Sequence, residues 1–187
     1  MYHIKQDKRA YKSAELLYQG LCQCIQQKDF SKITVQDLQQ ASSVSRATFY
    51  RHFDSLIDIL HWRCNQQFLE MWSMYKPSPH AQFYDFVQYF LTYWIDNSQI
   101  LEILLTIQRT DIIYTCHINN LSAFQEKFLS ILPLPIDHGQ YFMGIRAGIM
   151  TGVLTTWLQN GKQESVEEVL EIVKSQFEFI RQTKLMI

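Results

Sequence analysis

The sequence predicts an all-α protein of nine helices, on three observations. Apolar residues recur every three or four positions along most of the 187-residue chain, and no run alternates apolar and polar residues as a half-buried strand does. Six Gly and four Pro leave few breaks, which favours long helices. Apolar residues make up 47% and aromatic residues 14%, which is enough for a folded core and too much for a disordered chain.

The N-terminal third is predicted to hold one long and two short helices. Apolar residues spaced three and four positions apart mark an amphipathic first helix. Thr34, with Asp37 three residues later, is close to a capping box, and Ser45 is a good N-cap after the break at Ser42 and Ser43. The three helices are expected over residues 8–27, 35–41 and 46–52.

Breaks along the remaining chain divide it into six more helices. Pro77 ends the fourth helix, because proline removes a backbone donor and disfavours a helical residue before it. Gly161 follows the eighth helix where a glycine commonly ends one, and Ser165 with Glu168 forms a capping box for the ninth. The expected ranges are 54–75, 82–96, 99–108, 112–132, 140–159 and 165–182.

The formal net charge of −1 conceals an uneven distribution. Residues 1–63 hold nine Lys and Arg against six Asp and Glu, a net charge of +3, whereas residues 64–187 carry −4. The total charge alone argues against a nucleic-acid partner. The basic N-terminal segment is compatible with one.

Two short helices joined by a tight turn predict a helix-turn-helix, whose second helix enters the major groove of DNA. Val44, Ser45, Thr48, Tyr50 and Phe53 match, at the right spacing, the pattern A-G-V-S-x-x-T-x-Y-x-x-F of TetR-family transcriptional regulators. The N-terminal third therefore resembles the DNA-binding domain of that family. The resemblance implies a nine-helix TetR-like fold, with a DNA-binding domain over residues 1–54 and a helical dimerisation and effector domain over residues 55–187.

The residue types of the second short helix suit contacts with DNA. Arg46 can bond guanine O6 and N7, and Ala47 can touch a thymine methyl group, because both lie at the helix start. Hydroxyl, imidazole and cationic side chains suit phosphate oxygens, as does a helix N-terminus. Val44, Phe49 and Phe53 are interpreted as core that fixes the helix. The candidate DNA-binding residues are Lys32, Thr34, Ser45, Arg46, Ala47, Thr48, Tyr50, Arg51 and His52.

Three positions depart from the family pattern. Ser43 replaces the usual turn glycine, which predicts strain or a modified turn. Gln39 replaces a small alanine that packs between the two short helices. Leu56 replaces a lysine that commonly binds phosphate, so weaker or less salt-dependent binding is expected. The alternative is therefore a helical interaction protein, or an activator, of the same fold without ligand control.

Small residues on the predicted eighth helix indicate close packing against another helix. Glycines at every fourth position form a smooth stripe, which we interpret, with the amphipathic last helix, as half of a four-helix dimer interface. Packing of these two helices within one chain is the alternative. A homodimer suits DNA, because two half-sites need two recognition helices. The candidate interface residues are Gly144, Gly148, Gly152, Trp157, Val169, Val173 and Phe177.

The middle helices are rich in aromatic side chains, which are typical of ligand sites but more often form a packed core. The family resemblance implies a small-molecule effector, whose identity the sequence does not give. Arg146 could face an acidic ligand or pair with an acid such as Glu102 or Asp111. The candidate pocket residues are Trp72, Phe90, Tyr93, Trp94, His117, Met143 and Arg146.

Other classes of function lack their sequence signatures. There is no Gly-rich phosphate loop, H-E-x-x-H, G-x-S-x-G or C-x-x-C, so neither catalysis nor a metal or cofactor is expected. No apolar run approaches the roughly 20 residues that cross a bilayer. Four Cys without zinc spacing suit reduced thiols in the cytoplasm. The sequence thus predicts a cytoplasmic, dimeric DNA-binding repressor of a palindromic operator, released by a small molecule.

Overall fold

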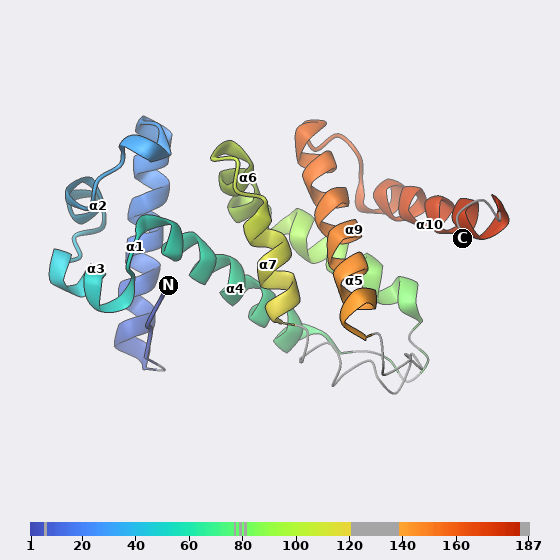
Figure 1. Ribbon diagram of the computed structural model, residues 1–187, viewed down its shortest axis with the longest axis horizontal. Coiled ribbons are helices and arrows are strands. Elements are labelled where there is room, and N and C mark those ends of the chain that lie inside the picture. Colours follow the sequence, from blue (N-terminus) through green and yellow to red (C-terminus); the bar gives the residue numbers. More distant parts are fainter. Residues whose placement is uncertain (6, 77, 79, 81, 121–138, 184–187) are drawn as a thin grey trace.

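The computed structural model describes residues 1–5, 7–76, 78, 80, 82–120 and 139–183. These residues form nine α-helices, one short 3-10 helix (η1) and no strand, which confirms the expected all-α class (Figure 1). The elements are α1 (Lys8–Gln27), η1 (Phe30–Lys32), α2 (Val35–Ser42), α3 (Arg46–His52), α4 (Leu56–Met74), α5 (Phe83–Asp96), α6 (Gln99–Thr106), α7 (Asp111–Asn119), α9 (Gly139–Gln159) and α10 (Val166–Thr183).

Most helix boundaries fall within two residues of the expected ones, but the helix predicted over residues 112–132 ends early. Helix α7 ends at Asn119, because the Asn120 side chain donates a hydrogen bond back to the Cys116 carbonyl at 2.8 Å. The same amide group donates to the Asn65 side-chain oxygen of α4, also at 2.8 Å. The rest of the predicted range, from residue 121, lies outside the described residues.

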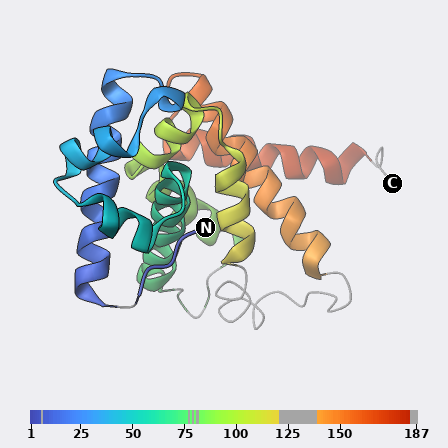
Figure 2. The same cartoon turned by 60° about the vertical axis from the view of Figure 1, so that its left-hand side comes forward.

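Helix α4 connects the two parts of the molecule. Helices α1, α2 and α3 pack together, and α4 leads from them into a bundle with α5, α6, α7 and α9 (Figures 1 and 2). The last helix, α10, packs against α5 and α9 and then extends beyond the bundle in both views. Over residues 166–179, where the side chains of α10 are described, the buried residues are Val169, Leu170 and Val173, all in the first half of the helix.

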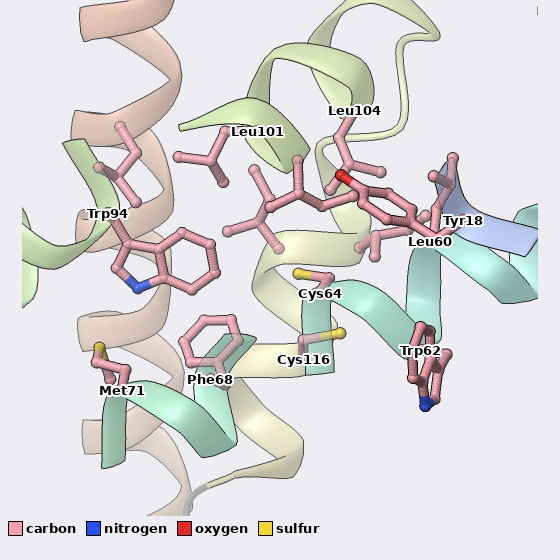
Figure 3. Close-up of a cluster of buried hydrophobic side chains, with 14 of the residues drawn as sticks. Tyr18, Leu60, Trp62, Cys64, Phe68, Met71, Trp94, Leu101, Leu104 and Cys116 are labelled. Atoms are coloured by element: carbon pink, nitrogen blue, oxygen red, sulfur yellow. The ribbon is translucent and has the colours of Figure 1, made fainter. Parts of the chain in front are cut away.

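The core of the bundle forms where α4 meets α5, α6 and α7 (Figure 3). Phe68 of α4 and Trp94 of α5 are fully buried, with ring centroids 4.7 Å apart. Leu101 and Leu104 of α6 complete the same cluster. Full burial of each such side chain contributes roughly 1.5–3 kcal/mol, so this cluster is what holds α4 in the bundle. All four cysteines are free thiols.

A glycine lets α1 and α2 approach each other closely. A Cβ atom on Gly20 would lie 2.7 Å from Cβ of Ser42, a distance that real contacts do not reach. Ser42 is buried, and its hydroxyl donates to the Leu38 carbonyl at 2.6 Å and accepts from the Val44 amide at 3.2 Å. The end of α2 is therefore seated directly on α1, and this contact positions the helix that follows.

Candidate nucleic-acid interface

Helix α2 begins with the capping box that the sequence predicts. The Asp37 amide donates to the Thr34 hydroxyl oxygen at 3.2 Å, and the Asp37 carboxylate accepts from the Thr34 amide at 2.7 Å. Lys28 of the preceding loop pairs with the same carboxylate at 2.6 Å. Hydrogen bonds from Lys28 and Thr34 lower the pKa of Asp37 to about 2, so the carboxylate stays ionised at neutral pH.

The turn between α2 and α3 keeps the left-handed backbone that a glycine would favour. Ser43 has φ 56° and ψ 16°, and its amide donates to the Gln39 carbonyl at 3.0 Å. The expected strain at Ser43 is therefore present, because a side chain is disfavoured in this region. Gln39 does not pack between α2 and α3 as the family pattern suggested; it is exposed to solvent.

Helix α3 is held by one capped end and one buried face. The Thr48 amide donates to the Ser45 hydroxyl oxygen at 3.2 Å, which caps the first turn. Phe49 and Phe53 are 1% and 0% exposed, and Val44 is buried before the helix starts. This burial leaves the opposite face of α3 in solvent.

The exposed face of α3 collects most of the predicted DNA-binding residues. Arg46, Ala47, Tyr50 and Arg51 are all exposed, and the Arg46 guanidinium carbon lies 5.5 Å from the centroid of the Tyr50 ring. Thr48 accepts hydrogen bonds at its hydroxyl oxygen from Ser45, at 3.0 Å, and from Arg51, at 2.9 Å. The face therefore presents two cations, a phenol and two hydroxyl groups, with the arginines oriented by neighbouring side chains.

Three predicted DNA-binding residues lie elsewhere. Lys32 is in η1 and pairs with Asp29 at 2.7 Å on the surface, and Thr34 is engaged as the cap of α2. His52 is only 5% exposed and lies in the wall of a groove between α3 and the segment that precedes α1. Burial, followed by the charge of Arg51, lowers the pKa of His52, so its imidazole is neutral at pH 7.

The start of α4 carries acids rather than a cation. Leu56 is half-buried and packs against the core. The Asp58 carboxylate accepts hydrogen bonds from the Ser55 amide at 2.9 Å and from its hydroxyl at 2.8 Å. Asp54 and Asp58 both pair with the ammonium group of Met1, at 3.1 and 2.9 Å, so the acids at this helix end are already engaged within the chain.

The predicted effector residues are mostly packed against one another. Trp72, Phe90, Trp94, His117 and Met143 are each 6% exposed or less. The Phe90 and His117 rings stack with centroids 5.4 Å apart. Burial and then the charge of nearby Arg146 lower the pKa of His117 to about 4, so this ring is neutral at pH 7. The described side chains thus fill the region as a core.

Arg146 and Tyr93 occupy different surroundings. Arg146 is 9% exposed, and its guanidinium carbon lies 4.6 Å from the centroid of the Phe83 ring. Burial lowers the pKa of Arg146 to about 10, which leaves it charged at pH 7. Tyr93 faces the outside of α4, where its hydroxyl donates to Glu70 at 3.4 Å. The structure therefore places a positive charge, but not Tyr93, beside the aromatic cluster.

The predicted dimer residues divide between an open face and the inside of the chain. Gly148 and Gly152 are exposed, with nothing within 4 Å of an added Cβ, whereas one on Gly144 would contact the Tyr114 hydroxyl at 3.4 Å. The other four residues make contacts within the chain: Trp157, Val169 and Val173 are buried, and the Phe177 ring lies 6.4 Å from that of Phe83.

A groove of about 330 Å³ runs along α9 and α10 on this open face. It is lined by Gly148, Ile149, Gly152, Val153, Thr156, Trp157, Asn160, Glu164, Val169 and Ile172.

The described part of the chain has no group of three His, Cys, Asp or Glu side chains placed as metal ligands would be. None of the described helices combines the length and apolar character needed to span a bilayer.

Comparison with known proteins shows a family match in the N-terminal part of the chain and similar folds among solved structures. Residues 17–60 match the sequence profile of bacterial regulatory proteins of the tetR family. The fold is similar to that of Lin0861 from Listeria innocua, with a TM-score of 0.78 at 16% identity over 95% of this chain and 96% of that one. It is also similar to a TetR transcriptional regulator from Streptococcus agalactiae 2603V, with a TM-score of 0.55 at 21% identity over 89% and 94% of the two chains. No curated protein matches the sequence.

Replacing Ser43 by glycine should stabilise the fold. The substitution relieves the left-handed strain, and the greater freedom of the unfolded chain offsets part of the gain, so a net increase of about 0.5–1 kcal/mol is expected. Thermal unfolding followed by circular dichroism measures it as a rise of roughly 1–4 °C. Ser43→Ala is the matched control, because it removes the hydroxyl and keeps the Cβ atom. A Ser43→Gly melting temperature no higher than that of Ser43→Ala would contradict the strain.

Proposed function

Because the chain belongs, through residues 17–60, to the tetR family of bacterial regulatory proteins and regulates transcription by binding DNA, we propose that it does so as a dimeric repressor released by a small molecule. The observation that carries the proposal is the exposed face of α3. Its phenylalanines are buried on one side, while Arg46, Ala47 and Tyr50 face solvent on the other. Such a helix can enter the major groove without disturbing its own packing.

The exposed side chains divide between base and phosphate contacts. Arg46 lies at the N-terminal end of α3, where side chains reach base edges, and its guanidinium group can bond guanine O6 and N7 together. The Tyr50 ring beneath it, at 5.5 Å, limits the orientations of that group. Thr48, Tyr50 and Arg51 carry donors for phosphate oxygens. Arg46 would therefore specify sequence, and the others would fix the position of α3.

The dimer part of the proposal rests on the open face of α9 and α10. Ile145 and Ile172 are 64% and 52% exposed, and the apolar groove between the two helices includes Gly148 and Gly152. A second copy of the same face is a self-complementary partner for a surface of this kind, with the glycines allowing a close approach. Two recognition helices held in this way would read two half-sites.

Release by a small molecule is supported by the charge of Arg146. A cation that is 9% exposed beside Phe83 would favour an anionic ligand with an apolar body. Because the aromatic side chains are packed together, such a ligand would have to displace one of them and so alter the bundle that holds α4. A panel of small aromatic carboxylates, with their amides as controls, should include one that raises the melting temperature of the unaltered chain but not of Arg146→Met. Equal shifts for both chains would contradict this site.

Replacing Arg46 and Tyr50 separately should affect DNA binding in different ways. Arg46→Ala should cost about 1–3 kcal/mol and relax the base preference at one position of each half-site, because the base contact is lost. Tyr50→Phe keeps the ring under Arg46 and removes only the hydroxyl, so it should weaken binding to all sequences about equally. Fluorescence anisotropy on a selected duplex and its single-base variants separates the two effects. Identical profiles for the two variants would refute this division of roles.

A charge on the open face should disrupt the dimer and leave the fold intact. Ile172→Glu should weaken dimerisation by about two orders of magnitude, because an unpaired charge buried in an interface costs about 3 kcal/mol. Sedimentation velocity measures the change. Leu69→Glu, at a position of α4 that is 43% exposed, is the control and should remain dimeric. An Ile172→Glu chain that sediments like the unaltered one would contradict the interface.

A further inference from the structure

A groove of about 490 Å³ lies beside α3, between this helix and the segment that precedes and begins α1. From α3 it is lined by Thr48, Arg51 and His52. Its other wall is formed by residues that the helix-turn-helix pattern does not include: His3, Lys5, Asp7, Arg9, Ala10 and Ser13. Thr48 and Arg51 belong both to this groove and to the exposed DNA-facing side of α3, so the two surfaces are continuous.

Backbone contacts hold the N-terminal segment next to the end of α3. Tyr2 and Phe53 form an antiparallel bridge, and the His3 amide donates to the His52 carbonyl at 2.8 Å. Asp7 then caps α1, because its carboxylate accepts from the Arg9 and Ala10 amides at 2.9 and 2.8 Å. Both walls of the groove, α3 on one side and the N-terminal segment with the start of α1 on the other, are therefore held by hydrogen bonds.

The groove has an excess of positive charge. Lys5, Arg9 and Arg51 line it together with one acid, Asp7, whose carboxylate is already engaged by the amides of α1. In the described residues, no acidic side chain forms an ion pair with any of these three cations. The His3 ring is directed to Asp54, at 3.2 Å. Two formal positive charges thus remain available to an anion.

A buried histidine in the wall also indicates a ligand. His52 lines the groove, is 5% exposed, and has no hydrogen-bond partner for Nδ1 among the described residues. A buried polar nitrogen without a partner is costly and uncommon in a folded chain. A ligand bound in the groove could supply the missing hydrogen-bond partner of His52 Nδ1, directly or through a water molecule.

We propose that this groove binds a phosphate of the DNA backbone at the edge of the major groove that α3 reads, with Lys5 and Arg9 as additional phosphate-binding residues. The inference rests on the proposed function, since it needs α3 in the major groove. The backbone of duplex DNA borders that groove, so cations beside a recognition helix meet phosphates there. The N-terminal segment then adds sequence-independent affinity and fixes the angle of α3.

The salt dependence of binding tests this assignment with the full chain. Lys5→Ala and Arg9→Ala should each weaken binding to a selected duplex. Each should reduce the magnitude of the slope of log affinity against log salt by about 1.8 for the dimer, because one phosphate contact is lost from each of the two subunits. Discrimination between the selected duplex and a scrambled one should not change. Lys8→Ala is the matched control, because Lys8 is exposed next to the same residues but does not line the groove. Thermal unfolding verifies that every variant is folded.

The outcomes distinguish a failure of the groove assignment from a failure of the proposed function. If both Lys5→Ala and Arg9→Ala keep the salt slope of the unaltered chain, the groove does not bind a DNA phosphate. The same holds if Lys8→Ala reduces the slope as much as they do. In either case the proposed function still stands. Failure of the unaltered chain to bind any duplex would overturn the proposed function, and the groove assignment with it. Inorganic phosphate at 10 mM, used as a probe, separates a DNA phosphate from a free anion. If it raises the melting temperature of the unaltered chain but not of Arg9→Ala, while both chains keep the same DNA slope, the groove serves a free anion and the DNA assignment is wrong.

Discussion

The exposed face of α3, which we propose to face DNA, depends on the burial of the opposite side of this helix. A seven-residue helix is too short to be stable alone in water, so α3 exists because Phe49 and Phe53 are removed from solvent against α1 and α4. Its position depends in turn on the contact between Gly20 and Ser42, which seats the end of α2 on α1.

Helix α4 gives this local arrangement its connection to the rest of the molecule. It starts beside α3 and continues into the core, where Phe68 packs on Trp94 and the Asn65 side chain accepts a hydrogen bond from Asn120 of the α7 end. Helix α4 thus contacts both α1 and the helices of the bundle, so the two parts of the molecule share one element. This geometry gives a physical route by which a ligand near Arg146 could alter DNA binding.

The sequence predicted those features that depend on residues only a few positions apart. The caps at Thr34 and Ser45 and the left-handed turn at Ser43 follow from hydrogen bonding and backbone sterics within a few residues, and they could be read from the sequence. The end of α7 could not, since Asn120 stops it by bonding to Asn65, which is 55 residues away. For the same reason His52 was assigned to the surface, and the groove at Lys5 and Arg9 was missed. Only the cluster of Lys5, Lys8 and Arg9 near the start of α1, part of the net charge of +3 over residues 1–63, pointed to it.

The most direct measurement is selection of binding sites from random DNA duplexes by the full chain at low salt. If α3 reads bases in a dimer, the enriched sites will be two-fold symmetric, with half-sites about one helical turn or a multiple of it apart, near 34–36 Å for one turn. Enrichment of no sequence would contradict base reading by α3. Enrichment of single, unpaired half-sites would contradict the dimer that presents two such helices.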